Sequence, residues 1–328
     1  MVVIQRANHA EIEGKQVKVL ILGGCGFIGK NLAEILVEDG IPSVVFDKNA
    51  DPQQSSPSYL FIQGEFSDRA KLETIIESQS ITHVIHLVST TLPKSSNEDK
   101  PYDLSSNVIQ TLHLLDLCVK YQIKKILFMS SGGTIYGVPN TVPVDESHPN
   151  DPICSYGISK LAIEKYLFLY RQLYGLNYIA LRAANPYGPG QNPHSGQGVI
   201  ANFAHKILSQ QPIEVWGDGS IVRDYFHVHD LAKLTKLALL SSETGVFNAG
   251  SGVGVSLNQL IRTLGAVVNC PTDIVYKEQR GLDVPAIVLN CAAAQSKFGW
   301  QTEISLRTGI EDYVSWYRAT YQKDGTRK

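Results

Sequence analysis

Apolar residues in this chain occur in short runs that alternate with longer segments of helical spacing. Residues 17–24 (VKVLILGG) form an apolar run of strand length that ends in glycine, which is typical of a strand buried on both faces. Residues 30–40 follow with helical spacing, and residues 42–47 (PSVVFD) are again strand-like. Together the three segments predict one β-α-β unit.

The same alternation continues along the next part of the chain. We expect strands over residues 82–89, 124–131 and 177–185, and amphipathic helices over residues 105–121 and 156–175. Strands that alternate with helices predict an α/β fold with a doubly wound parallel sheet of the Rossmann type.

After residue 185 the alternation gives way to a segment rich in glycine and proline, NPYGPGQNPHSGQG. The later elements are shorter and more mixed. We therefore expect a nucleotide-binding domain over residues 15–185. Residues 186–328 should form mainly a smaller α/β domain that binds the substrate, with some segments returning to the first domain and a ligand cleft between the two.

Composition narrows the class of ligand. The chain has 328 residues, 43% of them hydrophobic, with a formal net charge of -2, so nothing in its charge points to nucleic acid or an anionic membrane. The first residues lack the pattern of a signal peptide, and no apolar run approaches the roughly 20 residues of a membrane span. Five scattered cysteines without C-x-x-C spacing fit a reduced cytoplasm and no zinc site. A small-molecule ligand is the better expectation.

A glycine-rich turn joins the first strand to the first helix. In GGCGFIG, Gly23, Gly26 and Gly29 are spaced so that the backbone can approach a pyrophosphate at the helix N-terminus. Asp47 ends the next strand, where a carboxylate can accept hydrogen bonds from the adenosine ribose and repel a 2'-phosphate. NAD is therefore favoured over NADP, although Lys48 lies beside it. The alternative is a purely structural turn and a turn-forming aspartate.

Tyr156 and Lys160 stand four residues apart in CSYGISK, so on a helix they share a face. A tyrosine with an ordinary pKa near 10 can act as a base near neutral pH only if nearby positive charge stabilises its phenolate. Lys160 can supply that charge. The alternative is a surface tyrosine beside a lysine whose stem covers apolar surface.

Five motifs occur together along residues 17 to about 313: GGCGFIG, SSGGTIYG, YGISK, NPYGPGQ and RDYFHVHD. In this order and spacing they resemble the extended short-chain dehydrogenase/reductase family, and within it the NAD-dependent nucleotide-sugar epimerases of the UDP-glucose 4-epimerase type. The resemblance implies carbohydrate metabolism and a homodimer in which the helices containing LHLLDLC and LAIEKYLFLY pair across an axis. The alternative for these helices is an internal core.

The resemblance implies that Tyr156 is the catalytic base and Lys160 its electrostatic partner. A serine or threonine that bonds the reacting hydroxyl is expected at the position of Gly132, so the hydroxyl must come from Ser131 or, second, from Thr134. Family dehydratases carry an Asp-Glu pair just after this hydroxyl, which is absent here, so a 4,6-dehydratase is not expected.

The resemblance also implies two sets of binding residues. The expected NAD contacts are Gly23, Gly26, Phe27, Ile28, Gly29, Asp47, Lys48, Glu65, Phe66, Leu87, Asn107, Tyr156 and Lys160. The expected substrate contacts are Ser131, Tyr156, Asn185, Val199, Arg223, Arg280 and Asp283. Asn107 could instead serve a helix cap or an internal hydrogen bond. His227 and His229 alternate as on a strand, but two ligands without a third make a poor metal site.

These features lead us to expect an enzyme that epimerises a UDP-hexose at C4 through a 4-keto intermediate, with NAD held tightly. The natural sugar stays open among glucose, N-acetylglucosamine and a uronic acid. A nucleotide-sugar 4-keto reductase would use the same tyrosine and lysine but consume NAD(P)H. A non-catalytic NAD-binding scaffold would not need the pair.

Overall fold

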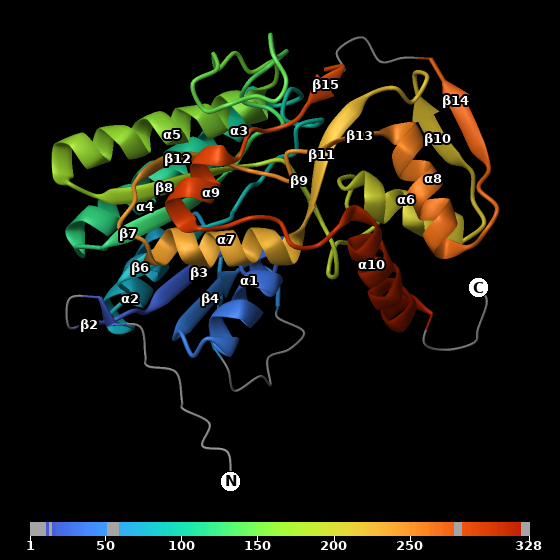
Figure 1. Cartoon of the computed structure of the whole chain (residues 1–328). Coiled ribbons are helices and arrows are strands. Elements are labelled where there is room, and N and C mark those ends of the chain that lie inside the picture. Colours follow the sequence, from blue (N-terminus) through green and yellow to red (C-terminus); the bar gives the residue numbers. More distant parts are fainter. Residues whose placement is uncertain (1–10, 13–14, 51–58, 279–283, 323–328) are drawn as a thin grey trace. The chain divides into compact units, whose positions relative to one another are not determined.

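The computed structural model describes residues 11–12, 15–50, 59–278 and 284–322 (Figure 1). The chain divides into two compact units whose segments alternate along the sequence. Unit 1 comprises residues 1–130, 154–181 and 235–246, and unit 2 comprises residues 131–153, 182–234 and 247–328.

The central feature is a seven-stranded sheet with the order β12-β8-β7-β6-β3-β4-β5. The pairs β3–β4, β3–β6, β4–β5 and β6–β7 are parallel. From β3 the chain first adds strands β4 and β5 on one side and then adds β6, β7 and β8 on the other, so the order of the strands reverses between β3 and β6. In open α/β sheets, ligands bind at the carboxyl ends of the strands at such a switch point. The expected doubly wound α/β fold is confirmed. The strands of the sheet are β3 (Val19–Leu22), β4 (Ser43–Asp47), β5 (Leu60–Gln63), β6 (His83–His86), β7 (Lys125–Ser131), β8 (Asn177–Ala183) and β12 (Gly245–Ala249).

Strand β3 shows why the apolar runs form the centre of the sheet. Leu20 and Leu22 belong to the core formed with α2 (Arg69–Ser78), α4 (Gln110–Lys120) and α5 (Ser155–Tyr174). Val19 and Ile21 point to the opposite face, because side chains alternate along a strand, and they are equally buried.

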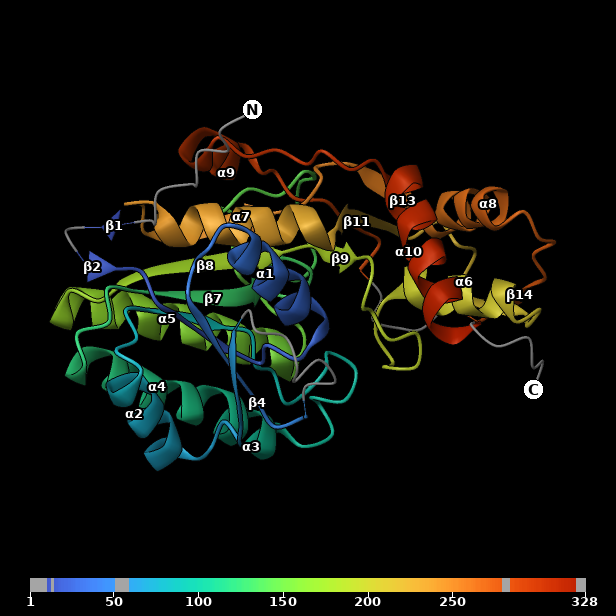
Figure 2. The ribbon, with the colours of Figure 1, turned by 90° about the horizontal axis from the view of Figure 1, so that it is seen from below.

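The helices form a layer on each face of the sheet. Figure 2 shows α1 (Phe27–Glu38) and α7 (Val228–Leu240) on the face opposite to α2, α4 and α5. Lys236 of α7 pairs with Asp39, the residue that caps the C-terminus of α1. Both faces of the sheet are therefore covered, as the continuous apolar strands require.

A π-helical segment, η1 (Leu104–Ile109), lies between α3 (Lys100–Asp103) and α4. Such segments are rare and occur mostly at functional sites. This one contains Asn107, an expected cofactor contact. Outside the main sheet, β1 (Glu11–Ile12) and β2 (Lys15–Gln16) form an antiparallel pair.

Unit 2 is built around β11 (Val222–His227), which pairs in parallel with β9 and β15 and antiparallel with β13. Strands β10 and β14 form a separate parallel pair. The hydrophobic core of unit 2 is formed by side chains of α6, α8 and α10 packed against side chains of β9, β10 and β11. The remaining elements are β9 (Asn185–Tyr187), β10 (Ile213–Trp216), β13 (Gly254–Ser256), β14 (Ile274–Lys277), β15 (Ala286–Ile287), α6 (Val199–Leu208), α8 (Leu257–Val268), α9 (Ala292–Phe298) and α10 (Leu306–Tyr321).

Candidate active site

The glycine turn after β3 is shaped for a close approach of backbone. Gly23 has φ +80°, and a Cβ there would lie 3.2 Å from the nitrogen of Val88. A Cβ on Gly29 would lie 2.6 Å from the carbonyl oxygen of Gly23, so only glycine lets α1 start this close to β3. Gly26 is the N-cap of α1 and brings no side chain over the helix N-terminus. This cradle fits a pyrophosphate, whose charge the helix dipole favours.

Asp47 lies beside this turn at the end of β4. One carboxylate oxygen accepts the N–H of Cys25 at 3.0 Å, and the other accepts the N–H of Asn49 at 2.9 Å. The carboxylate is therefore fixed next to the glycines, and each of its oxygens can accept a further bond from a ribose hydroxyl. Lys48 is exposed next to it.

The other expected cofactor residues lie in different surroundings. The N–H of Leu87 donates to the carbonyl of Leu22 at 3.0 Å, which places Leu87 at the switch point beside the turn. Phe66 is a core residue whose ring lies 4.9 Å from that of His86, whereas Glu65 is exposed. Phe27 and Ile28 open α1 and are half-buried.

Asn107 makes only internal hydrogen bonds among those that the structure resolves. Its side-chain oxygen accepts the N–H of Thr90 at 3.0 Å, and its amide nitrogen donates to the carbonyl oxygen and the carboxylate of Asp103 at 3.0 and 3.1 Å. These bonds match the internal alternative that the sequence left open. Its contact with a cofactor stays a prediction.

Tyr156 and Lys160 share a face of α5, as their spacing predicts. The ammonium of Lys160 lies 5.4 Å from the ring centroid of Tyr156 and 4.6 Å from that of Phe128. It donates a hydrogen bond to the carbonyl of Met129 at 2.8 Å and is 6% exposed. The lysine is therefore held against the phenol within unit 1 and does not extend into solvent, which excludes the alternative of a surface pair.

Burial shifts the ionisation of both residues in directions that matter for catalysis. It lowers the pKa of Lys160 to about 8, although Asp103 and Glu164 oppose the shift. It raises the pKa of Tyr156 to about 12; Cys154 and Asp103 act in the same direction, and a hydrogen bond with the Ser89 side chain opposes them. Tyr156 can thus serve as a base near neutral pH only when further positive charge adjoins its phenol.

The hydroxyl candidates Ser131 and Thr134 belong to unit 2. A Cβ on Gly132 would lie 2.5 Å from the Leu289 side chain and 3.0 Å from the carbonyl of Arg182, so a serine here would require the Leu289 side chain to move. The Thr134 hydroxyl is buried and has no hydrogen-bond partner among the described residues. Ser131 ends β7. Both hydroxyls remain candidates for bonding the reacting group.

Besides Ser131, three expected substrate contacts of unit 2 lie on three further elements. Asn185 of β9 donates to the carbonyl of Asp224 at 2.9 Å. Arg223 of β11 donates to the carbonyl oxygens of Val222 and Val284 at 2.8 and 2.7 Å. Val199 begins α6 and packs against the unit 2 core. Arg280 and Asp283 lie outside the described residues.

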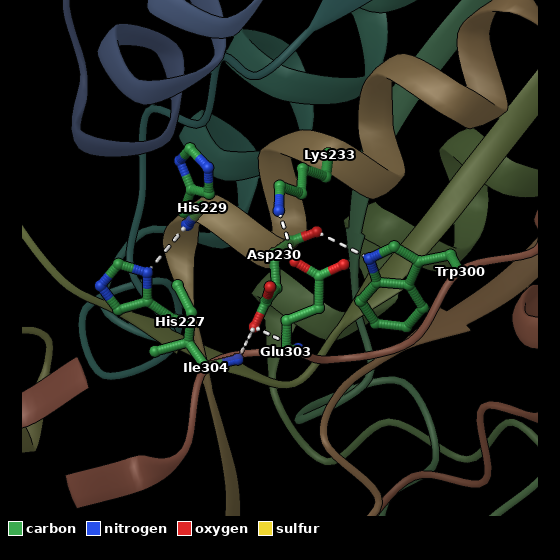
Figure 3. A network of polar contacts seen from close by, with 7 residues as sticks. All are labelled: His227, His229, Asp230, Lys233, Trp300, Glu303 and Ile304. Atoms are coloured by element: carbon green, nitrogen blue, oxygen red, sulfur yellow. Dashed lines mark hydrogen bonds and ion pairs between the residues drawn. The ribbon is translucent and has the colours of Figure 1, made fainter. Parts of the chain in front are cut away.

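His227 and His229 take part in a structural network at the start of α7 (Figure 3). The N–H of His229 donates to Nδ1 of His227 at 3.3 Å, and the two imidazole rings point apart. The next residue, Asp230, accepts the N–H groups of Glu303 and Ile304 at 3.3 and 3.2 Å. Among the described residues no group of three or more potential ligands could hold a metal ion. Asp230, and not the histidine pair, therefore ties the start of α7 to the segment before α10.

Sequence reasoning missed a polar cluster at the start of α5. The buried carboxylate of Asp103 accepts hydrogen bonds from the hydroxyls of Ser155 and Ser159 at 2.8 and 2.6 Å. The available signal was the spacing of the two serines, four residues apart around Tyr156, which places them on one helix face.

The chain is similar to several known proteins. A model of the NAD dependent epimerase/dehydratase family matches residues 19–250. The dTDP-4-dehydro-6-deoxyglucose reductase of Escherichia coli is 36% identical over 306 residues, which cover 90% of this chain and 96% of the reductase. Within the described part of the chain, no helix has the length and apolar character needed to cross a membrane.

Two solved structures are also similar. The UDP-glucose 4-epimerase of Thermotoga maritima with UDP-glucose superposes with a TM-score of 0.89 at 34% identity, over 93% of this chain and 99% of that one. The UDP-glucose 4-epimerase of Thermus thermophilus in complex with NAD superposes with a TM-score of 0.87 at 33% identity, over 93% of this chain and 100% of that one.

Proposed function

Because the chain belongs to the NAD dependent epimerase/dehydratase family, we propose that it interconverts the C4 epimers of a UDP-hexose through a transient 4-keto sugar. The observation that carries the proposal is the buried Lys160 ammonium held against the Tyr156 ring on α5. The similarity to solved 4-epimerases supports the choice of reaction within the family.

The chain's own residues would hold the cofactor and move one proton. The glycines of the turn would accommodate the pyrophosphate, and Asp47 would accept hydrogen bonds from the adenosine ribose. When bound, NAD⁺ supplies the hydride acceptor for C4 and a positive charge in the site. Tyr156, as phenolate, would accept the proton of the C4 hydroxyl as hydride leaves C4, and would return it to the C4 oxygen when the hydride adds back to the opposite face of the 4-keto sugar.

The two shifted pKa values fit this division of labour. With a pKa of about 8, Lys160 is mostly protonated near neutral pH and can stabilise a phenolate beside it. With a pKa raised to about 12 even beside Lys160, Tyr156 needs further positive charge before it ionises, and the oxidised cofactor would supply that charge. The proton acceptor would thus form chiefly when NAD⁺ is in place. Ser131 or Thr134 would bond the reacting hydroxyl.

We assign the nucleotide diphosphate to Arg223 and Arg280, because a forked guanidinium matches phosphate oxygens. Asp283 would accompany Arg280 at the nucleotide ribose, and Asn185 and Val199 would contact the substrate. The same proposal includes a cofactor domain over residues 15–185 and a domain over residues 186–328 that mainly binds substrate, with some segments returning to the cofactor domain. So does a cytoplasmic enzyme that serves polysaccharide biosynthesis.

A homodimer is supported by the exposed apolar face of α5. Ile158, Tyr166, Leu169 and Leu173 recur at helical spacing, and Leu173 is 61% exposed. A second copy of the chain would cover this face. Sedimentation should show a dimer for the wild type and a monomer for a Leu169→Glu, Leu173→Glu variant. A monomeric wild type would contradict the dimer without affecting the proposed reaction.

The function is tested by NMR of the purified protein with UDP-glucose, UDP-N-acetylglucosamine and UDP-glucuronate, with no cofactor added. We expect one of them to convert to its 4-epimer, which would establish epimerisation with retained NAD and identify the sugar class. If none converts even after NAD is supplied, the epimerase proposal is wrong.

A second candidate is a nucleotide-sugar 4-keto reductase, favoured by the 36% identity to the Escherichia coli reductase. Tyr156, with Lys160 beside it, would then donate one proton to the C4 oxygen while NAD(P)H supplies the hydride to C4. Incubation with a 4-keto nucleotide sugar distinguishes the two, because a reductase oxidises one equivalent of NAD(P)H for each product formed. An epimerase shows no net change in cofactor absorbance.

A further inference from the structure

Helix α5, which carries Tyr156 and Lys160, is capped by a distant segment. Its N-cap residue, Cys154, makes no side-chain cap bond. Instead, the N–H of Ser155 donates to the side-chain oxygen of Asn97 at 2.9 Å, and the N–H of Tyr156 donates to the hydroxyl oxygen of Ser96 at 3.0 Å. These are two of the N–H groups that a helix cannot satisfy internally. The cap therefore comes from residues 96–97.

This external cap is itself held in place. Ser96 is fully buried, its hydroxyl donates to the carbonyl of Pro93 at 3.3 Å, and its N–H donates to the carbonyl of Leu92 at 2.9 Å. The hydroxyl oxygen is thus oriented to accept from Tyr156. Asn97 is exposed, so its side chain can be changed without disturbing a core.

A second contact fixes the same turn from the side. Asp103 is 0% exposed, and one of its carboxylate oxygens accepts the hydroxyls of Ser155 and Ser159, one helical turn apart. The other oxygen accepts the hydroxyl of Thr91 and the amide of Asn107. A buried carboxylate is tolerated only when its lone pairs are satisfied, and these four donors satisfy it. The bonds hold α5 against rotation and sliding.

We propose that Ser96, Asn97 and Asp103 are positioning residues that fix the first turn of α5, and with it Tyr156 and Lys160, in the geometry of proton transfer. The inference rests on the proposed function, because it assigns these residues a part in that reaction. None of them needs to touch substrate. A misplacement of about 1 Å at reacting groups can cost about 100-fold in rate, so a small shift of this turn is enough to matter.

Asp103 has an electrostatic effect that the two cap residues lack. Its charge raises the pKa of both Tyr156 and Lys160. An Asp103→Asn change removes the charge while the serine hydroxyls can turn to accept from the new amide. Loss of the charge should therefore move the ionisation of Tyr156 to lower pH. Among the described residues, Cys154 also raises the pKa of Tyr156, Glu164 raises that of Lys160, and Lys160 in turn lowers that of His86.

The first test compares caps. Asn97→Ala removes the oxygen that accepts the N–H of Ser155, and Asn97→Asp restores an acceptor there. The control is Ser305→Ala at the N-cap of α10, where the Ser305 side chain accepts the N–H of Thr308. We expect Asn97→Ala and Ser96→Ala each to lower kcat about 10- to 100-fold, with KM within about twofold of the wild type. Asn97→Asp should recover the wild-type kcat. Ser305→Ala should leave kcat unchanged. If Asn97→Ala keeps the wild-type kcat, or lowers it no more than Ser305→Ala does, the positioning role is wrong.

The second test does not depend on turnover. The phenolate absorbance of the NAD-loaded enzyme is titrated with pH, and the curve of Tyr156→Phe is subtracted to isolate Tyr156. We expect Asp103→Asn to move this titration to lower pH and Asn97→Ala, which changes no charge, to leave it close to the wild type. An unmoved titration in a folded Asp103→Asn variant would contradict the proposal. If the wild type epimerises nothing, the proposed function fails, whereas this titration still reports on Asp103.

Discussion

The ammonium of Lys160 lies 5.4 Å from the centre of the Tyr156 ring and is anchored by a hydrogen bond of 2.8 Å to the carbonyl of Met129. One helical turn therefore places a fixed positive charge beside a weak acid. The anchor matters because a flexible lysine would lose side-chain entropy each time it approached the phenol.

Tyr156→Phe removes the proton acceptor and leaves the ring and its packing intact. We expect kcat to fall by about 10²- to 10⁴-fold, the usual contribution of general acid-base catalysis. The amount of NAD recovered from the denatured variant should match the wild type. Comparable turnover in the variant would show that another group accepts the proton.

Activity should depend on the protonation of Lys160. Since its pKa is about 8 and the ammonium is the active form, kcat/KM should fall as pH rises through this value. Glu164 raises the pKa of Lys160 and accepts the hydroxyl of Ser130 at 2.6 Å. Glu164→Gln keeps that acceptor but removes the charge, so the alkaline limb should move to lower pH. A pH profile of kcat/KM that is the same for both proteins would contradict the assignment.

Acid should destabilise the protein through a buried imidazole. Burial lowers the pKa of His86 to about 3, so between the ordinary value of 6.5 and about 3 the unfolded chain binds a proton that the folded chain does not. Because of this residue, the free energy of unfolding should decrease by about 1.4 kcal/mol for each unit by which the pH is lowered within this range. His86→Gln keeps a donor toward Thr111, whose hydroxyl lies 2.9 Å from Nε2. Urea unfolding at several pH values should show that the free energy of unfolding decreases less steeply in the variant than in the wild type as the pH is lowered.

The glycine turn gives a matched pair of alanine variants. A Cβ on Gly29 would lie 2.6 Å from backbone atoms of Gly23 and Gly24, so Gly29→Ala must displace the turn and reduce retained NAD. Gly175, at the C-terminus of α5, has φ +71° and nothing within 4 Å of a Cβ. Gly175→Ala should cost about 1 kcal/mol of stability through backbone strain. Its NAD content should stay at the wild-type level, and equal NAD loss in both variants would contradict a specific role for the turn.

The sequence was sufficient for the features that depend on local pattern. The helix expected over residues 156–175 is α5, Ser155–Tyr174, and the strand expected over residues 124–131 is β7, Lys125–Ser131. Periodicity and end signals decide these elements, because helix and strand spacing are set by nearby residues. The joint position of Tyr156 and Lys160 follows directly from helical spacing.

Features that depend on distant contacts could not be predicted in this way. The helix expected over residues 105–121 begins with the π-helical η1, which no local pattern indicated. The bond from Ser155 to Asn97 joins residues 58 positions apart, and the burial of Asp103 depends on how α3 packs against α5. From the sequence, Gly132 could be identified only as the position of a missing hydroxyl, whereas the structure shows that the Leu289 side chain packs against it.

The external cap of α5 also affects how the site could be transferred to another protein. A helix that caps itself can be moved with its own residues, whereas α5 gains two of its N-terminal partners from Ser96 and Asn97. A designer who transplants α5 alone would carry over the reactive side chains without the surface that holds them. The helix and its cap are therefore two separate pieces of chain, which must fold together before the reactive turn is held in place.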